Sequence, residues 1–396
     1  MTRPPRDRPS PRGAGLIILL AAAWSDAAVA CPFCGAVGQS LAQRRDQAAA
    51  VAVGEAVGDA ATNASGQPAQ RFRLDQLLRD DRRAARAGET VTARVVGPVA
   101  GTAVLFGTEA AASADGATPA VAWSAVAADE TLLGYVAAAP ATSRPAADRL
   151  RWFATRLEHP DAAIAADAFT EFGLAPYADV RGAAAAIDPA RLREWVDEPG
   201  IDARRRGLYG LLLGVVATAS REPAAAMACI DALRRAVSAP ADDFRAGFDG
   251  LLAGVLVAEG ERGLAFLRTR GLFGRAARPL DQRHLLAALR FAWESLADTI
   301  PRGSIVAATA ELLTSPAVAA DAAVDLARYR AWEAVPLVSG LWDRLGGDDP
   351  LIRRAVAGYL AACPLPAAKR ELERIRAADP LRLEQALDAA ALPAAR

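Results

Sequence analysis

The sequence contains few of the side chains that most often carry catalysis, metal binding or nucleic-acid recognition. Its 396 residues include two histidines, four cysteines and a single lysine, Lys369. Basic and acidic residues are equal in number at 46 each, which argues against the basic face that a nucleic-acid-binding protein needs. Because 53% of the residues are hydrophobic and 23% are charged, the composition still predicts a folded protein, and its length favours two domains.

The sequence also lacks an apolar run as long as a membrane-spanning helix, which needs roughly 20 consecutive apolar residues. Residues 1–30 instead combine four arginines, an apolar run at residues 14–23 and the small-residue site Ala28-Val29-Ala30. This order is typical of a removable export signal. We therefore predict a signal peptide over residues 1–30, a mature chain beginning at Cys31 with 42 basic and 44 acidic residues, and no transmembrane segment after cleavage. The expected location is extracytoplasmic, either periplasmic or secreted.

The four cysteines fall into one close pair and two isolated residues. Cys31 and Cys34 form a Cys-x-x-Cys motif, CPFC, at the predicted mature N-terminus, where an oxidising compartment favours a local disulfide. Lipid attachment at Cys31 is a variant of this interpretation. Cys229 and Cys363 lie in apolar helical patterns, in which a free thiol behaves as a small buried hydrophobic side chain.

The CPFC motif also fits chemical roles. It resembles the C-P-aromatic-C motif of glutaredoxins, which implies thiol-disulfide exchange. A zinc site needs two further ligands, and the histidines available for it are His159 and His284. Covalent haem attachment is excluded because Gly35 stands where a histidine is required. We expect a structural disulfide with no metal or cofactor, and thiol or metal chemistry at Cys31 and Cys34 is the alternative.

Residues 31–140 carry the pattern of a small β domain. Short runs rich in β-branched residues, separated by Gly, Pro, Asp and Asn, predict strands at 50–57, 90–96, 102–106 and 121–126. Residues 71–78, RFRLDQLL, alternate at first and then break into a leucine pair, which indicates a strand that runs into a turn. Closely spaced short strands favour a closed barrel, and we expect an OB-like or netrin-like one.

Residues 145–391 carry the helical period almost without interruption. Many of the expected helices begin at an Asp-Pro or Ser-Pro pair, as at Asp349-Pro350. A faint repeat relates residues 164–169, 318–323 and 352–360, and the last two are 34 residues apart. The pattern resembles HEAT-like repeats and predicts an all-α solenoid. The helices are expected at 145–158, 160–172, 189–197, 202–217, 222–238, 242–258, 261–270, 280–297, 302–314, 317–329, 332–345, 350–362, 366–377 and 380–391.

The remaining polar candidates have ordinary structural interpretations. His159 and His284 are each isolated, which favours capping or packing over a catalytic triad. Asp167, Glu171 and Asp179 could gather into an acidic cluster, but such groups usually lie in solvent near helix starts. We therefore predict no catalytic residue. Arginines and tryptophans of the helical region could bind an acidic peptide or a glycan, although surface and core positions are the ordinary interpretation: Arg204, Arg205, Arg206, Trp195, Trp293, Trp332 and Trp342.

Two family resemblances extend this interpretation. A barrel whose mature chain opens with Cys31 resembles the netrin-like domains of tissue inhibitors of metalloproteinases, which implies that a terminal cysteine chelates a protease zinc. The complete order resembles a family of uncharacterised exported bacterial proteins with CPFC, an OB-like β domain and a helical array. That resemblance covers CPFCG at 31–35, VLFGT at 104–108 and the segments 159–180, 204–214 and 359–372, and it implies an architecture without an activity.

The sequence thus predicts a non-enzymatic extracytoplasmic interaction or scaffold protein. Its expected partner is a protein or a cell-envelope component, because helical arrays expose an extended surface that is suited to binding. The alternatives are a thiol-dependent or metal-dependent activity centred on Cys31 and Cys34, and inhibition of a metalloprotease. The oligomeric state stays open.

Overall fold

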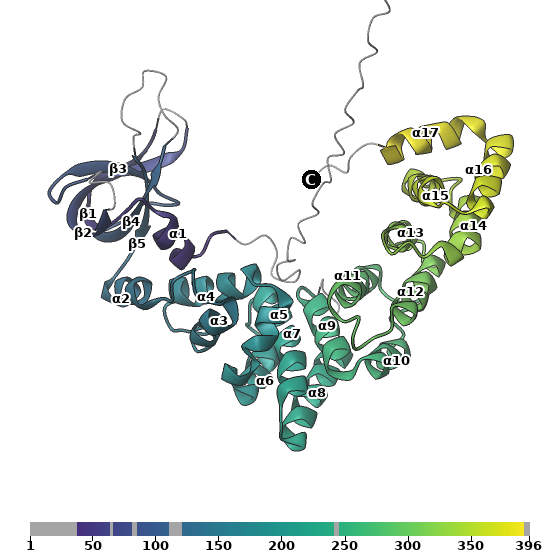
Figure 1. Cartoon of the computed structure of the whole chain (residues 1–396), viewed down its shortest axis with the longest axis horizontal. Helices are drawn as coiled ribbons and strands as arrows, with labels where there is room; N and C mark the ends of the chain where they lie inside the picture. Colours follow the sequence, from purple (N-terminus) through teal and green to yellow (C-terminus); the bar gives the residue numbers. More distant parts are fainter. Residues whose placement is uncertain (1–37, 64–65, 81–84, 111–120, 241–244, 392–396) are drawn as a thin grey trace, which may run out of the picture.

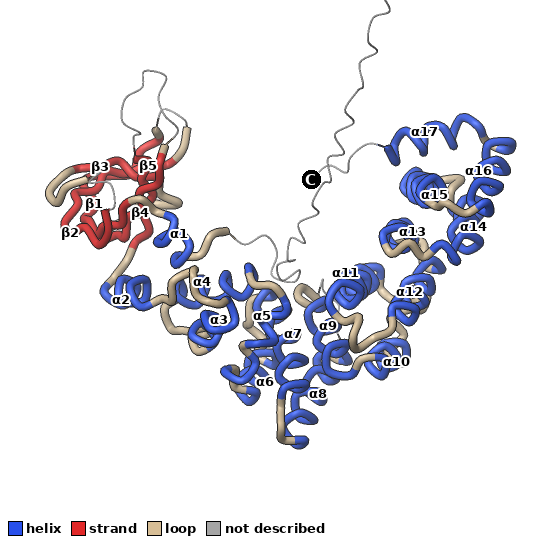
Figure 2. The backbone as a smooth tube through the Cα atoms, in the orientation of Figure 1, coloured by secondary structure: helices blue, strands red, loops and turns tan. Residues whose placement is uncertain are grey.

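A computed structural model describes residues 38–63, 66–80, 85–110, 121–240 and 245–391. Within these ranges a small closed barrel of five strands is followed by a mostly helical region (Figures 1 and 2). The predicted signal peptide, Cys31 and Cys34 lie outside the described residues. The predicted combination of an N-terminal β-barrel and a C-terminal helical region is confirmed.

The barrel closes in the order β1-β2-β3-β5-β4, with β4 returning to β1. All neighbouring strands are antiparallel except β3 and β5, which pair in parallel through Ala93 with Trp123 and Arg94 with Ser124. The strands are β1 (Ala50–Thr62), β2 (Pro68–Asp80), β3 (Thr90–Arg94), β4 (Thr102–Glu109) and β5 (Val121–Ala127).

The barrel forms because alternate residues of its strands can enter an apolar interior. Ala52, Phe72 and Leu105 belong to that interior, whereas Val104 and Phe106 point outward into the core shared with the helices. Both faces of β4 are therefore covered, which explains why its apolar residues form a continuous run rather than an alternating one.

The leucine pair in β2 marks a bulge and not a turn. Leu77 pairs with Ala52 and Arg79 pairs with Val51, so Leu78 has no partner on β1 and the strand continues to Asp80. The expected turn was therefore wrong. Leu77 packs against the barrel interior, whereas the unpaired Leu78 is exposed.

The helical region begins directly after the barrel, and one further helix, α1 (Leu41–Gln47), precedes β1. Three short 3-10 helices interrupt it: η1 (Ala184–Ala186), η2 (Leu312–Thr314) and η3 (Trp332–Ala334). The α-helices are α2 (Glu130–Ala138), α3 (Ala146–Ala154), α4 (Ala162–Leu174), α5 (Tyr177–Gly182), α6 (Pro189–Asp197), α7 (Ala203–Ala219), α8 (Pro223–Ser238), α9 (Phe248–Glu259), α10 (Glu261–Thr269), α11 (Pro279–Ser295), α12 (Arg302–Glu311), α13 (Ala319–Arg328), α14 (Val335–Leu345), α15 (Pro350–Ala362), α16 (Pro366–Ala378) and α17 (Pro380–Ala391).

The helices follow an open arc with the barrel at one end and α17 at the other (Figure 1). From α9 onward, odd-numbered helices lie along its inner side and even-numbered helices along its outer side (Figure 1). Aspartates cap several of the expected starts, including Asp161, Asp188 and Asp349. None of the helices within the described ranges is long and apolar enough to span a membrane.

Aromatic residues and thiols fill the spaces between helices, as the sequence indicated. Trp293 stacks on Tyr329 with ring centroids 4.2 Å apart, and Trp195 contacts Tyr209. Trp332 meets Tyr359 edge to face. Cys229 and Cys363 are both free and buried within the same extended core: each behaves as a small apolar side chain.

Helices α7 and α9 approach each other more closely than ordinary side chains allow. A Cβ built on Gly254 would collide with the carbonyl oxygen of Gly210, and one on Gly250 would collide with that of Gly207. Helices pack at such short distances where small residues replace the usual side-chain layer. The glycines of α7 and α9 are thus required by this crossing.

We expect Gly254→Ala to lower the free energy of unfolding by about 1–3 kcal/mol, since the added methyl group forces the two backbones apart. Gly340→Ala in α14 is the matched control, because its Cβ would meet no heavy atom within 4 Å. That control should gain about 0.5–1 kcal/mol from helix propensity. Chemical denaturation measures both variants, and equal stability of the two would contradict the close packing.

Candidate functional site

A polar cavity lies between the outer face of the barrel and helix α1. Its volume is about 480 Å³, within the range of small-molecule sites. We call it the barrel cavity. Its lining residues come from α1 and the segment before it, from β2, β3, β4 and β5, and from the β1–β2 connection: Gln39, Arg44, Gln47, Asn63, Gln67, Ala69, Thr92, Arg94, Phe106, Thr108, Val121, Ala122, Trp123 and Ser124.

Strand register brings the central residues of the barrel cavity together. Arg94 of β3 pairs with Ser124 of β5, and Ser124 pairs in turn with Phe106 of β4. These three residues form one row across the outer face, since paired residues point to the same side of a sheet. Arg44 of α1 covers the row: its Nη2 donates to Ser124 Oγ at 3.0 Å, and its guanidinium carbon lies 4.5 Å from the Phe106 ring centroid.

The barrel cavity has a positive electrostatic character. Burial lowers the pKa of the Arg44 guanidinium from its ordinary value, and the nearby positive charge of Arg94 lowers that pKa further. Asp167 opposes this effect from outside the cavity. Among the described residues that line the cavity there are two arginines and no carboxylate.

Helix α1 carries Arg44 to this position, and a capping box starts the helix. The Ser40 side chain accepts a hydrogen bond from the Gln43 backbone N–H at 3.1 Å, and the Ser40 N–H donates to the Gln43 side chain at 3.2 Å. Seven residues are too few for a stable isolated helix, so contacts with the rest of the molecule must hold α1.

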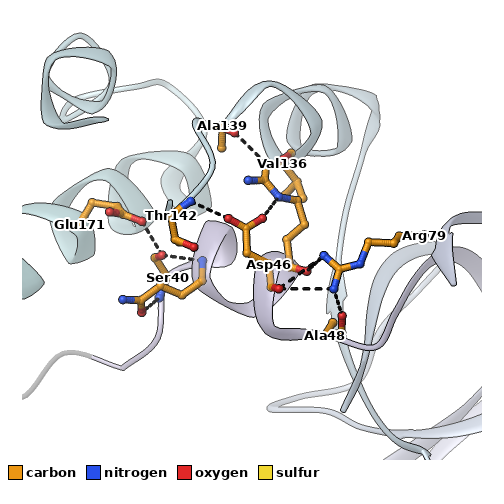
Figure 3. A network of polar contacts seen from close by, with 10 residues as sticks. Ser40, Asp46, Ala48, Arg79, Val136, Ala139, Thr142 and Glu171 are labelled. Carbon is orange, nitrogen blue, oxygen red and sulfur yellow. Dashed lines mark hydrogen bonds and ion pairs between the residues drawn. The ribbon is translucent and has the colours of Figure 1, made fainter. Parts of the chain in front are cut away.

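Two buried carboxylates of α4 supply the main contacts. Ser40 Oγ donates to Glu171 Oε1 at 2.5 Å (Figure 3). The Leu41 N–H donates to Asp167 Oδ1 at 2.7 Å. The Tyr135 hydroxyl donates to Asp167 Oδ2 at 2.7 Å, and Glu171 also forms an ion pair with Arg149. Burial raises the pKa of both carboxyl groups.

Charged residues connect the other side of α1 to α2 and to the barrel (Figure 3). Arg45 donates to the carbonyls of Val136 and Ala139 at 2.7 and 2.8 Å, satisfying oxygens at the C-terminal end of α2. Asp46 accepts from the Thr142 N–H at 2.6 Å, and Arg79 of β2 donates to the Ala48 carbonyl. We call residues 40–48 with these partners the α1 joint.

The structure corrects one expectation about acidic residues. Asp167 and Glu171 are only 7% and 3% exposed, so they are not the solvated helix-start residues that the sequence indicated. They lie one helical turn apart on α4 and face α1, whereas Asp179 belongs to α5. Within the described ranges, no three or more His, Cys, Asp or Glu side chains gather in a metal-binding group.

The other sequence candidates occupy structural positions. His159 Nδ1 accepts from the Asp161 N–H at 3.0 Å beside the start of α4, and His284 meets Phe248 edge to face. Arg205 forms an ion pair with Glu158 at 3.0 Å. These contacts agree with the capping and packing roles expected for the two histidines, and His284 Nδ1 also lies 3.7 Å from Asp249 Oδ1. Cys31 and Cys34 lie outside the described residues.

Sequence analysis missed Arg44, Arg94 and the whole of α1. The signal that could have located α1 is the pattern Ser40-x-x-Gln43, which is typical of a capping box at a helix start. Arg94 could not be found in this way, because its position in the cavity depends on pairing with β5 and on α1 above it.

Comparison with known proteins provides no further guide to the site. No protein-family model, no curated protein and no solved structure matches the chain. Functional inference therefore depends on the residues of the barrel cavity and the α1 joint themselves.

The α1 joint predicts a defined pH dependence. The folded-state pKa of Asp167 lies above the unfolded value of about 3.9, so the folded chain binds more protons between the two values. Stability from this group is fully present below about pH 3.9 and is lost as pH rises through the folded pKa. The slope cannot exceed about 1.4 kcal/mol per pH unit for one proton.

Asp167→Asn should remove this slope, so that the stability of the wild type falls relative to that of the variant as pH rises. Chemical denaturation at a series of pH values from about 4 upward measures the difference, with Asp388→Asn on exposed α17 as the control. Parallel stability curves for the wild type and Asp167→Asn would contradict the raised pKa.

Proposed function

We propose that this chain is a non-enzymatic extracytoplasmic interaction protein that binds a ligand in the barrel cavity and uses its helical region as a scaffold. The observation that carries the proposal is the chemistry of the cavity lining. It offers hydrogen-bonding side chains and two arginines, and among its described residues there is no cysteine, histidine, aspartate, glutamate or lysine. Such a lining binds polar ligands readily.

Proton transfer has no suitable partner in this lining. Arginine stays protonated at any physiological pH, so Arg44 and Arg94 can bind and orient a ligand without exchanging protons with it. Ser124 accepts from Arg44 and donates to the Phe106 carbonyl at 3.4 Å, and no base contacts its hydroxyl among the described residues. These contacts support binding over nucleophilic catalysis.

The finer fold assignments support the same function. The strand order with a parallel β3–β5 pair favours an OB-like barrel, a fold that binds oligonucleotides and oligosaccharides on its surface. The two rows of helices along the arc favour a HEAT-like array, which offers an extended surface to a protein or envelope partner. Both assignments are fold-level analogies, and the barrel cavity carries the functional argument.

The predicted signal peptide over residues 1–30 supports an extracytoplasmic location. We expect mass spectrometry of protein recovered from the cell envelope to show a chain that begins at Cys31 with a Cys31–Cys34 disulfide two mass units lighter than its reduced form. A lipid at Cys31 would add the mass of its acyl chains. Unprocessed chain found only in the cytosol would contradict the location, and a stoichiometric metal or cofactor at these cysteines would favour the alternative activity.

A cavity-filling variant tests the binding function. Ala122 lies exposed on β5 at the cavity, and Ala122→Trp should fill the space without entering the barrel interior. We expect this variant to lose at least about 90% of its binding to isolated envelope fractions, which corresponds to a tenfold loss of affinity. Ala378→Trp, at an exposed position of α16 away from the cavity, is the matched control. Equal binding of both variants would contradict a role for the cavity.

A further inference from the structure

Arg44 lies beside a cavity whose described lining holds a second arginine and no carboxylate. Several other partly buried arginines form ion pairs with carboxylates, such as Arg149 with Glu171, Arg205 with Glu158 and Arg290 with Asp325, while Arg156 and Arg353 donate to backbone carbonyls. Arg44 instead contacts a hydroxyl group and an aromatic ring, and its charged neighbour in the cavity is Arg94. Two like charges beside one cavity are stabilised when an anion binds between them.

Arg94 is available for such an anion. It is exposed, and while its backbone pairs with the neighbouring strands, its side chain forms no hydrogen bond or ion pair with any described residue. An arginine fork binds the two oxygens of a carboxylate, or of a phosphate or sulfate, in parallel hydrogen bonds. Arg44 and Arg94 therefore provide an oxyanion site on one side of the barrel cavity.

The rest of the lining favours a ligand rich in hydroxyl groups. Amide and hydroxyl side chains surround the arginines: Gln39, Gln47, Asn63, Gln67, Thr92, Thr108 and Ser124. The two aromatic residues, Phe106 and Trp123, are only 1% and 8% exposed, so neither offers a face on which a nucleic-acid base could stack. The apolar anchors that peptide ligands usually need are scarce as well.

We infer that the barrel cavity binds an acidic saccharide, with its carboxylate or other oxyanion between Arg44 and Arg94 and its hydroxyl groups on the surrounding amides and hydroxyls. The inference rests on the proposed binding function and names its ligand class. A volume of about 480 Å³ accommodates a short oligosaccharide segment.

Isothermal titration calorimetry with the full mature chain tests the inference by comparing the affinities of three matched probes. Trigalacturonate is the acidic saccharide, maltotriose is a neutral saccharide of the same length, and triglutamate is an acidic peptide. We expect trigalacturonate to bind at least about tenfold more tightly than either of the others, and its affinity to fall as ionic strength rises. Inorganic phosphate, a free oxyanion, should bind at least about tenfold more weakly than trigalacturonate.

Arg94→Gln should weaken trigalacturonate binding at least about tenfold, because it removes a charged hydrogen-bond donor. Arg370→Gln on α16 makes the same change at an exposed position far from the barrel and should bind like wild type. Thermal unfolding of Arg94→Gln verifies that the barrel is intact. NMR provides a measurement that needs no variant. The backbone amide resonances of Thr92 and Ser124 should shift when trigalacturonate is added to the wild type.

Several results would overturn the inference. These are no binding of trigalacturonate, equal binding of maltotriose, triglutamate or inorganic phosphate, unchanged binding by Arg94→Gln, and unshifted Thr92 and Ser124 signals. A different result would contradict the proposed function, namely equal envelope binding by Ala122→Trp and its control. If Ala122→Trp abolishes envelope binding while trigalacturonate does not bind, the ligand class is wrong and the binding cavity stands.

Discussion

The hydrogen bonds from the start of α1 to the buried carboxylates of α4 are the contacts on which the arrangement of the molecule depends. Asp167 and Glu171 accept the Leu41 N–H and the Ser40 hydroxyl, and the neighbouring residues of α1 bind α2 and β2. Carboxylates are costly to bury unless their oxygens are satisfied, so removing α1 would leave both without these donors. The α1 joint therefore links the barrel to the helices through buried polar groups that depend on α1 for these hydrogen bonds.

The same joint determines the chemistry of the barrel cavity. Strand pairing alone places Arg94, Ser124 and Phe106 in one row, but that row would be an open barrel surface without α1. The helix adds Arg44 and encloses the space from one side. A seven-residue helix cannot fix a guanidinium group by itself, and the contacts with α4 hold it in place. The barrel cavity and the connection between the two regions thus share one element.

Much of the fold could be predicted from the sequence, because the spacing of apolar residues within most helices and strands indicates the type of element. The alternation of β2 around Phe72 and the aspartate-capped starts such as Asp349 each depend on local patterns. Helices α1 and α5 escaped prediction because six or seven residues carry too little periodic signal, and α2 escaped because it lies in the segment assigned to the β domain. The β2 bulge escaped because register is set by the partner strand. The candidate site was almost wholly missed, since it arises where separate elements meet.

The two charged sites respond differently to pH, which separates binding from structural change. Arg44 and Arg94 stay charged throughout the physiological range, so a strong oxyanion would be bound without dependence on the acidity of the surroundings. Asp167 and Glu171 have raised pKa values because they are buried, and protonation relieves the cost of their charge. Mild acid therefore strengthens the α1 joint while leaving the charge of the barrel cavity unchanged.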